Sequence, residues 1–368
     1  MLISGWMLAS RVPLKKLFNE GTNGKTEFGR FVTKQQEIMP YKPIPVGKPI
    51  RIAMLGCGFA ARIHSKTLAS HKDVRIYYAS RSLEKANKYN RKYKGAGAFE
   101  GYEAAIQSPD VDVVMVLTPP VQHLKLTLDA IKAGKHVIVE KPPFLNSSDF
   151  ALIREAQEEH KVQVMVAENY FYKPSLKHLQ DLLGSGIIGD VKFVVINALK
   201  KQKTENWRDD ISQAGGGALF EGGIHWVNYL SNLGYHIQTV QGFIPGEQTG
   251  MERSVQVVAK FAEGAVGTLL YSWEVDSLFK GLRLSKAYGT KGSITFESNG
   301  LFIFVRGKRW KLIFPGLRDI SGYKAMFEDF KKALRSGKEP RFNLSLAERD
   351  LQIIELINED VSEDISGY

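Results

Sequence analysis

The sequence predicts two folded units: an α/β domain with a doubly wound parallel sheet, then an α+β domain with a large, open, mostly antiparallel sheet. Three observations lead to this prediction. The chain has 368 residues, enough for two domains. Short apolar strands alternate with helical segments up to residue 139, and closely spaced strand-like segments follow Pro174. We therefore divide the chain into an N-terminal arm and linker (1–49), a first domain (50–170) and a second domain (171–368).

The first domain has the pattern of successive βαβ units. Its most informative stretch is VDVVMVL at 111–117, an unbroken apolar run typical of a parallel strand buried on both faces. Strands and helices of this length in alternation predict right-handed crossovers and a doubly wound sheet. The other strands are expected at 50–55, 74–79 and 136–139, with one helix ending at 70 and others at 83–93 and 124–133.

The second domain is expected to form one sheet, because its strand-like segments are separated only by short turns. A sheet with only one covered face tends to find a partner, so we expect a homodimer or homotetramer through it, with the N-terminal arm as a further contact. The predicted elements are a helix at 175–183, strands at 191–198, 237–244, 254–262, 265–273, 282–288, 291–297, 301–305 and 309–314, and closing helices within 323–358.

Composition and charge exclude several classes of protein. The net charge is +11, but residues 1–49 hold eight Lys or Arg against three acids, so they supply +5 and leave +6 for the rest. The sequence has no run of five like charges and no nucleic-acid motif, so we expect no nucleic-acid partner. No apolar stretch is long enough to cross a bilayer or to resemble a secretory signal, so we expect no membrane partner and a cytoplasmic protein. Cys57 is the only cysteine, which excludes an intramolecular disulfide and a cysteine zinc site, and we expect no metal.

A glycine-rich turn, Gly56-Cys-Gly58-Phe59-Ala60-Ala61, follows the first predicted strand and opens a helix. The first glycine permits a tight turn, the second lets the backbone approach a pyrophosphate, and Ala61 lets the helix pack close to the strand. The start of that helix can then hold the anion. Because the motif stands at the first of several βαβ units, it predicts a dinucleotide-binding Rossmann domain, the alternative being a glycine turn without a ligand.

The end of the second strand indicates which nicotinamide cofactor is bound. NAD sites usually place Asp or Glu about 20 residues after the glycines, where it binds the ribose 2′-hydroxyl. Here the stretch reads YASRS at 78–82, and the nearest acid, Glu84, lies in the following helix. Ser80 can donate to a 2′-phosphate and Arg81 can pair with it, so we predict NADP, with NAD as the alternative.

Further motifs follow the glycine turn in a characteristic order. They are His64, TPPxxH at 118–123, AGKHV at 133–137, EKP at 140–142, WR at 207–208 and GGGALFEGGIH at 215–225. Together they resemble the glucose–fructose oxidoreductase / inositol dehydrogenase / MocA family over about residues 50–358. The resemblance implies NAD(P)-dependent hydride transfer to or from a carbinol or carbonyl carbon of a sugar, cyclitol or sugar derivative.

The resemblance also implies roles for individual residues. It places Lys141 against the nicotinamide and substrate, where the ammonium could stabilise a developing alkoxide or lower its own pKa enough to shuttle the proton. Glu140, beside it at the end of the strand, is interpreted as an anchor or structural partner of the lysine instead of an acid catalyst. The resemblance makes His225 the group that exchanges a proton with the substrate, which suits a side chain whose ordinary pKa is near 6.5. A cis Lys141–Pro142 bond would aim the lysine. The cofactor-binding set is completed by Thr118, Pro119, His123 and Glu140.

Two departures from the family pattern concern the substrate pocket. In the pattern D-x-G-x-H-x-x-D the first aspartate is Glu221 here and the last is Asn228, which cannot raise the basicity of a histidine as a carboxylate could. Aromatic rings suit the apolar face of a pyranose, and a guanidinium suits a carboxylate or phosphate. The predicted substrate-binding residues are Tyr170, Tyr172, Trp207, Arg208, Glu221 and Asn228.

Two other functions fit the same pair of domains. Some members of the family reduce an unsaturated or imine-like small molecule. Others are non-catalytic NAD(P)-binding sensors or regulatory proteins in which the lysine or histidine is replaced. Both Lys141 and His225 are present in this chain, which favours an enzyme acting on CH–OH groups.

Overall fold

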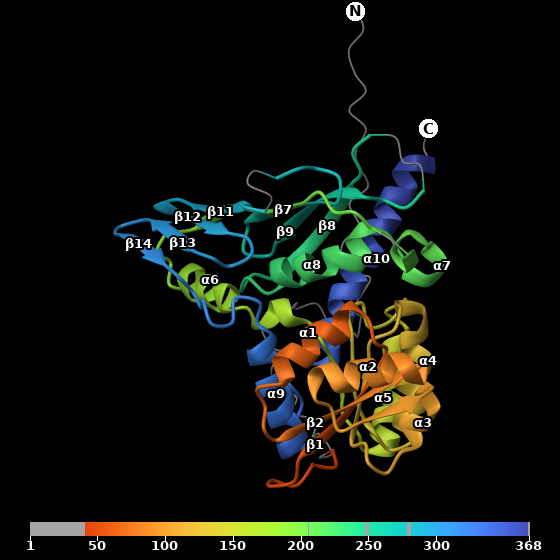
Figure 1. Ribbon diagram of the computed structural model, residues 1–368. Helices are drawn as coiled ribbons and strands as arrows, with labels where there is room; N and C mark the ends of the chain where they lie inside the picture. Colours follow the sequence, from red (N-terminus) through yellow and green to blue (C-terminus); the bar gives the residue numbers. More distant parts are fainter. Residues whose placement is uncertain (1–40, 205, 247–249, 278–280, 367–368) are drawn as a thin grey trace, which may run out of the picture.

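A computed structural model describes residues 41–204, 206–246, 250–277 and 281–366. Two sheets dominate it, one of six strands and one of eight. In Figure 1 the six-stranded sheet and its helices form the lower half, and the eight-stranded sheet lies above them. This arrangement confirms the predicted fold class. Most of the predicted arm falls on residues 1–40, which lie outside the described residues, as does its predicted contact with a partner.

All neighbours in the six-stranded sheet are parallel, in the order β3-β2-β1-β4-β5-β6. The order reverses between β1 and β4, and in such sheets ligands bind at this point, outside the carboxyl ends of the strands. Every residue of β4 and β5 is buried, as expected when helices cover both faces. The strands are β1 (Ile50–Leu55), β2 (Val74–Ser80), β3 (Gly97–Glu100), β4 (Val113–Val116), β5 (His136–Val139) and β6 (Val164–Val166), and the helices are α1 (Phe59–Leu68), α2 (Leu83–Tyr93), α3 (Tyr102–Gln107), α4 (His123–Lys132) and α5 (Asp149–His160).

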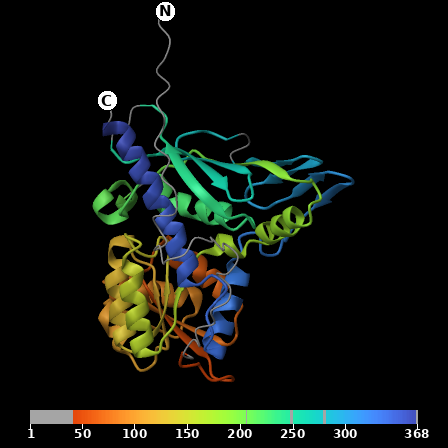
Figure 2. The ribbon, with the colours of Figure 1, turned by 180° about the vertical axis from the view of Figure 1, so that it is seen from behind.

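The eight-stranded sheet has the order β14-β13-β12-β11-β7-β10-β9-β8, and of its described neighbours only β7 and β10 run parallel. Helices α6 and α8 lie under one face, while the other face carries no helix among the described residues (Figures 1 and 2). The strands are β7 (Val191–Leu199), β8 (Ile237–Phe243), β9 (Ser254–Phe261), β10 (Val266–Ser272), β11 (Leu284–Gly289), β12 (Gly292–Glu297), β13 (Ile303–Arg306) and β14 (Trp310–Ile313). The helices are α6 (Pro174–Gly184), α7 (Ile211–Ala214), α8 (Ile224–Ser231), α9 (Tyr323–Ser336) and α10 (Leu344–Ser366).

The last two helices join the two sheets. Although α9 follows the second sheet in the chain, it packs beside α1 of the first domain. Helix α10 runs along the back of both halves (Figure 2). From it, Asp350 accepts a hydrogen bond from Asn228 of α8 at 2.6 Å, and Glu355 accepts one from the backbone N–H of Ser147 at 2.7 Å. The C-terminal segment therefore fixes the two domains to each other.

Two kinds of feature are absent from the part of the chain that the structure describes. No helix there is long and apolar enough to cross a bilayer. Nor do any three His, Cys, Asp or Glu side chains within that part gather as a set of metal ligands.

An ion pair joins β1 to the start of β4. Arg51 donates to the Asp112 carboxylate from Nε at 3.0 Å and Nη2 at 2.7 Å, and its backbone N–H adds a third hydrogen bond at 3.0 Å. Burial alone would raise the pKa of Asp112, but the hydrogen bonds and the charge of Arg51 outweigh it and lower that pKa. Asp110 approaches the same guanidinium at 3.6 Å from an exposed position.

Asp112→Asn is expected to lower the free energy of unfolding by about 1–3 kcal/mol near neutral pH, because it removes a charged acceptor of three hydrogen bonds. A carboxyl whose pKa is lower in the folded state stabilises above its unfolded pKa, near 3.9, and this contribution is lost as the pH falls through the folded value. Urea unfolding should therefore show the difference from wild type shrinking below roughly pH 4. Asp110→Asn, the matched control, should change stability by under ~0.5 kcal/mol. Equal losses in both variants would contradict this account.

Candidate active site

The turn between β1 and α1 is shaped to hold a pyrophosphate. Gly56 has a φ of +114°, and a Cβ there would lie 3.0 Å from the carbonyl oxygen of Leu117, so both conformation and space require glycine. Gly58 caps α1 in an extended conformation, and no described atom lies within 4 Å of the position its Cβ would take. Helix α1 has no side-chain cap in the described structure and no acid in its first turn, which leaves its N–H groups to an anion.

The residues beside these glycines differ in how far they are buried. Ala61 is fully buried, so α1 lies close to the sheet, and Ala60 is half-buried beside it. Phe59 is 60% exposed at the start of the helix, with the guanidinium of Arg62 5.0 Å from its ring centroid. Burial raises the pKa of Cys57 to about 11, so its thiol stays protonated and acts as a small buried side chain. The whole turn fits a dinucleotide.

A cationic side chain follows the carboxyl end of β2, and an acidic side chain lies at the same end of the neighbouring strand, β3. Ser80 is buried, and its hydroxyl accepts a hydrogen bond from the backbone N–H of Ser82 at 3.4 Å. Arg81 is exposed. On β3, Glu100 is exposed and pairs in register with Ser80. Sequence spacing does not reveal this acid, because the pairing of β2 with β3 brings Glu100 beside Ser80.

His123 fastens the turn that follows β4. Its Nε2 lies 2.7 Å from the carbonyl oxygen of Thr118, and its Nδ1 lies 2.9 Å from that of Pro142, after a cis Lys141–Pro142 bond. Burial lowers the pKa of His123, and a neutral ring has one N–H, so it donates to one of these two carbonyl oxygens and packs against the other. The ring therefore lies between the Thr118-Pro119 turn and the peptide that follows the lysine. The Thr118 hydroxyl is buried without a partner among the described residues, so a ligand at this edge could use it.

Glu140 anchors the main chain of Lys141. Its Oε2 accepts a hydrogen bond from the Lys141 backbone N–H at 3.0 Å, and its Oε1 lies 2.5 Å from Nε2 of His64. Burial would raise the pKa of Glu140, but the hydrogen bond and charge of His64 and the charge of Lys141 lower it. The carboxylate therefore pairs with His64, and the lysine ammonium is left to point elsewhere.

That ammonium reaches the second domain. Lys141 Nζ donates to the carbonyl oxygen of Glu221 at 2.7 Å and lies 3.9 Å from its carboxylate. Arg208 Nε donates to the same carboxylate at 3.0 Å, and its guanidinium lies 4.5 Å from the Trp207 ring centroid. Burial would raise the pKa of Glu221, but the charges of Lys141 and Arg208 lower it. Three charged residues of the predicted site, Lys141, Arg208 and Glu221, thus form one group, with the Trp207 ring beside it.

His225 lies one turn after Glu221, in the second position of α8. Its Nδ1 lies 2.7 and 2.8 Å from the two carboxylate oxygens of Glu168. The ring of Tyr170 stacks on the imidazole, with centroids 4.3 Å apart and planes 12° from parallel. Burial raises the pKa of Tyr170 to about 12, so its phenol stays neutral, and Lys173 Nζ lies 4.2 Å from the same ring. Glu168 thus holds His225 at Nδ1, and Tyr170 packs against one face of the imidazole ring.

Two predicted substrate-binding residues lie away from this group. The Tyr172 hydroxyl donates to Asp329 of α9 at 2.8 Å, and Asn228 donates to Asp350 of α10. They are 4% and 0% exposed, so each is enclosed in a contact between helices. We therefore leave Tyr172 and Asn228 out of the substrate site.

Two residues of the site were missed by sequence reasoning. Glu168 follows β6, and an acid at the carboxyl end of a parallel strand is a signal that could have found it. Tyr323 begins α9, and its ring meets that of His64 edge-on at 5.5 Å. No local pattern marks it, because only the packing of α9 on the first domain brings it to this edge.

Comparison with known proteins covers both domains. Residues 50–168 match the oxidoreductase family model with an NAD-binding Rossmann fold, and residues 176–295 match the GFO/IDH/MocA C-terminal domain. The dTDP-3,4-didehydro-2,6-dideoxy-alpha-D-glucose 3-reductase of Saccharopolyspora spinosa is 30% identical over 234 residues, which are 61% of this chain and 69% of that protein. Matched segments span between 50% and 96% of the curated relatives' own lengths.

Solved structures show the same fold. Levoglucosan dehydrogenase in complex with NADH and levoglucosan has a TM-score of 0.75 and 20% identity, covering 86% of this chain and 98% of that one. KijD10, a 3-ketoreductase from Actinomadura kijaniata in complex with NADP and TDP-benzene, has a TM-score of 0.76 and 20% identity, covering 85% of this chain and 98% of that one. At these identities the likeness concerns the fold alone. Because family models match both domains, the chain belongs to the GFO/IDH/MocA family of NAD(P)-binding oxidoreductases.

Proposed function

We propose that this protein transfers a hydride between a nicotinamide dinucleotide and a carbinol or carbonyl carbon of a sugar, cyclitol or sugar derivative. The observation that carries the proposal is the meeting of Lys141, after β5, with the Glu221–His225 turn of the second domain. This contact lies at the carboxyl edge of the parallel sheet, where the glycine turn also lies. A sugar-like substrate is supported by the relative named as a dTDP-3,4-didehydro-2,6-dideoxy-alpha-D-glucose 3-reductase.

The chemistry divides between the cofactor and the protein. A bound nicotinamide supplies the hydride acceptor or donor. The protein must handle the hydroxyl proton and the negative charge that develops on oxygen. His225 exchanges the proton, and the Lys141 ammonium stabilises the oxygen. Since Lys141 already donates to the Glu221 carbonyl, its head is held in place before a substrate binds.

NADP is the proposed cofactor because no acid occupies residues 78–82, where NAD sites usually place one, and Arg81 stands there. Glu100, in register with Ser80, is the acid that could instead bind a ribose 2′-hydroxyl and favour NAD. The two side chains therefore make opposite contributions to the choice of cofactor.

Arg81→Ala should raise the KM for NADP by ~10-fold or more and leave that for NAD within about threefold, because only the 2′-phosphate loses a charge-assisted partner. Glu100→Gln is the companion variant and should not weaken NADP. Cofactor fluorescence titration and steady-state kinetics measure both. An equal effect of Arg81→Ala on the two cofactors would refute the NADP assignment.

His225→Ala should lower kcat by ~100-fold or more while cofactor affinity stays unchanged, because the proton-transfer group is lost and the glycine turn is intact. A panel of sugars and cyclitols, followed at the nicotinamide absorbance, supplies the substrate for this test. A loss under ~10-fold would show that His225 does not have this role. Cofactor binding without turnover of any alcohol or ketone would favour a sensor over an enzyme.

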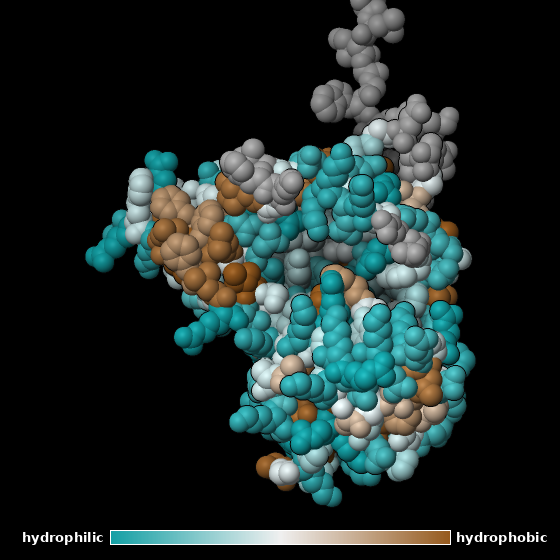
Figure 3. All heavy atoms as spheres, viewed as in Figure 1, coloured by the Kyte–Doolittle hydropathy of each residue, from teal (hydrophilic) through white to brown (hydrophobic). Residues whose placement is uncertain are grey.

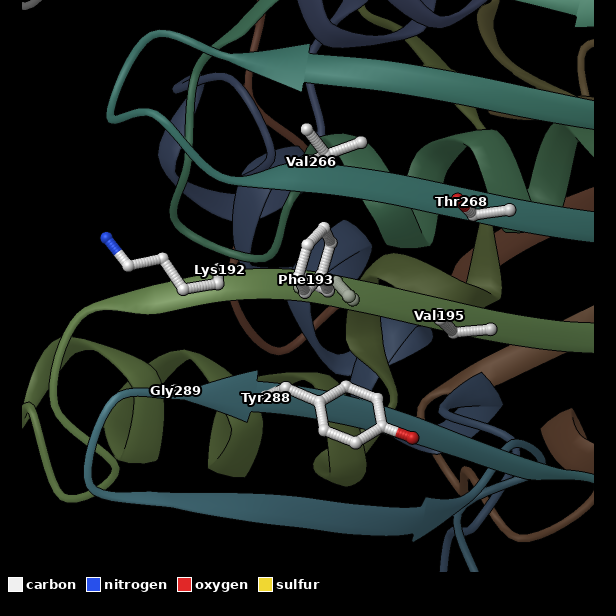
Figure 4. A pocket seen from close by; sticks show the side chains of 8 residues that line it. Lys192, Phe193, Val195, Val266, Thr268, Tyr288 and Gly289 are labelled. Carbon is white, nitrogen blue, oxygen red and sulfur yellow. The ribbon is translucent and has the colours of Figure 1, made fainter.

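We further infer that a second copy of the chain covers the open face of the eight-stranded sheet. Figure 4 shows Phe193, Val266, Thr268 and Tyr288 projecting from β7, β10 and β11. These side chains line a hollow with a volume of about 470 Å³. Phe193 and Tyr288 are 57% and 43% exposed. Figure 3 shows apolar side chains gathered over the β13–β14 end of the sheet as well. Apolar surface of this extent is typical of a protein interface.

Phe193→Glu should shift the protein from a dimer or larger assembly toward a monomer, because it buries a charge at the centre of the interface. Sedimentation velocity at one protein concentration measures the change. Leu152→Glu is the matched control, since Leu152 is 51% exposed on α5 of the other domain, and it should keep the wild-type assembly. A wild-type protein that sediments as a monomer would contradict the inference.

A further inference from the structure

Glu168 places a buried carboxylate beside the imidazole of His225. It is 2% exposed, and it lies within hydrogen-bonding distance of His225 Nδ1 and accepts from the backbone N–H of Tyr170 at 2.8 Å. The second contact caps the short turn that begins at Asn169, so the backbone fixes this side chain independently of the histidine. A buried carboxylate is costly unless it is paired, and these are its partners.

The contact determines which nitrogen of His225 carries the proton. An ionised carboxylate only accepts hydrogen bonds, so the Nδ1 that faces Glu168 must be the N–H donor. In a neutral ring the lone pair is then on Nε2. Among the described residues Nε2 has no hydrogen-bond partner, and the side chain is 15% exposed. Nε2 is therefore the nitrogen that can meet a substrate hydroxyl.

The other charged groups near His225 are engaged elsewhere. Glu140 and Glu221 both interact with it electrostatically, but the first pairs with His64 and the second with Lys141 and Arg208. Tyr170 offers the face of a neutral ring. Within the described residues, Glu168 is thus the one carboxylate hydrogen-bonded to the imidazole.

We propose that Glu168 is a positioning residue that holds His225 as the Nδ1–H tautomer, leaving Nε2 to exchange the proton. The catalytic consequence rests on the proposed function, whereas the tautomer does not. When an alcohol is oxidised, its O–H bond breaks as the proton passes to Nε2, its C–H bond breaks as the hydride passes to the nicotinamide, and a carbonyl forms. The resulting imidazolium lies beside the Glu168 carboxylate, and in reduction the same proton returns.

Glu168→Leu tests the proposal because it removes both oxygens that face Nδ1, at 2.7 and 2.8 Å, with little change in side-chain volume. The side chain at 168 then offers no acceptor, so it no longer holds the ring proton on Nδ1. Glu168→Gln is the milder companion variant. The Tyr170 N–H holds its amide oxygen at the place of Oε1, 2.7 Å from Nδ1, so that oxygen can still accept from Nδ1–H although the negative charge is lost.

Nitrogen NMR of the full chain, labelled with ¹⁵N-histidine and assigned with His225→Ala, reads the tautomer without any substrate. We expect a protonated Nδ1 and an unprotonated Nε2 in the wild type, and the loss of this single tautomer in Glu168→Leu. With a substrate, Glu168→Leu should lower kcat by ~100-fold or more and leave KM within about threefold, because Nε2 is no longer held as the accepting nitrogen. Glu168→Asp should recover part of kcat.

Glu297→Leu is the matched control, because Glu297 is 3% exposed in the domain that carries His225 and accepts hydrogen bonds from Asn299 and the Leu301 N–H. It should keep the wild-type tautomer and stay within about threefold in kcat. A wild-type ring protonated at Nε2, or an unchanged pattern in Glu168→Leu, would overturn the proposal. The expected tautomer in a protein that turns over no substrate would uphold it and remove the proposed function alone.

Discussion

The hydrogen bond from the Lys141 ammonium to the Glu221 carbonyl joins the two domains at the proposed site of chemistry. The site holds three carboxylates, two of them buried, and each would be costly without a partner. Glu140 hydrogen-bonds to His64, Glu221 pairs with Arg208 and the lysine, and Glu168 hydrogen-bonds to His225. Each carboxylate is thus held by side chains that the other two do not contact in this way.

This arrangement requires the domains to keep one relative position, and the C-terminal helices provide it. Helix α9 returns to the first domain and places Tyr323 against His64, which in turn holds Glu140. Helix α10 holds α8, which carries His225, through the bond from Asn228 to Asp350. The precision of the site therefore depends on segments that contribute no reacting group.

Local patterns in the sequence predicted the fold and the glycine turn well, because their causes are local. The strand at 136–139 and the helix at 83–93 occur with the predicted bounds. Strands β3 and β6 were not predicted. The β3 run, GAFE, is neither a continuous apolar run nor fully buried, and β6 has only three residues, too few to separate a strand from a loop. Pairings such as His225 with Glu168, 57 positions apart, depend on how the domains pack, so no spacing rule reveals them.

Asn228 shows how a departure from a motif can leave the chemistry intact. At that position the resemblance led us to expect a carboxylate for the histidine, and its absence seemed to weaken His225. In this fold the Asn228 side chain instead donates to Asp350, a fully buried carboxyl whose pKa is raised by burial. An aspartate at 228 would set two carboxylates 2.6 Å apart with no water between them, so an amide is the side chain that this contact needs. Glu168 faces His225 Nδ1 from beyond the carboxyl end of β6, so the histidine has a carboxylate at that nitrogen although residue 228 is an amide.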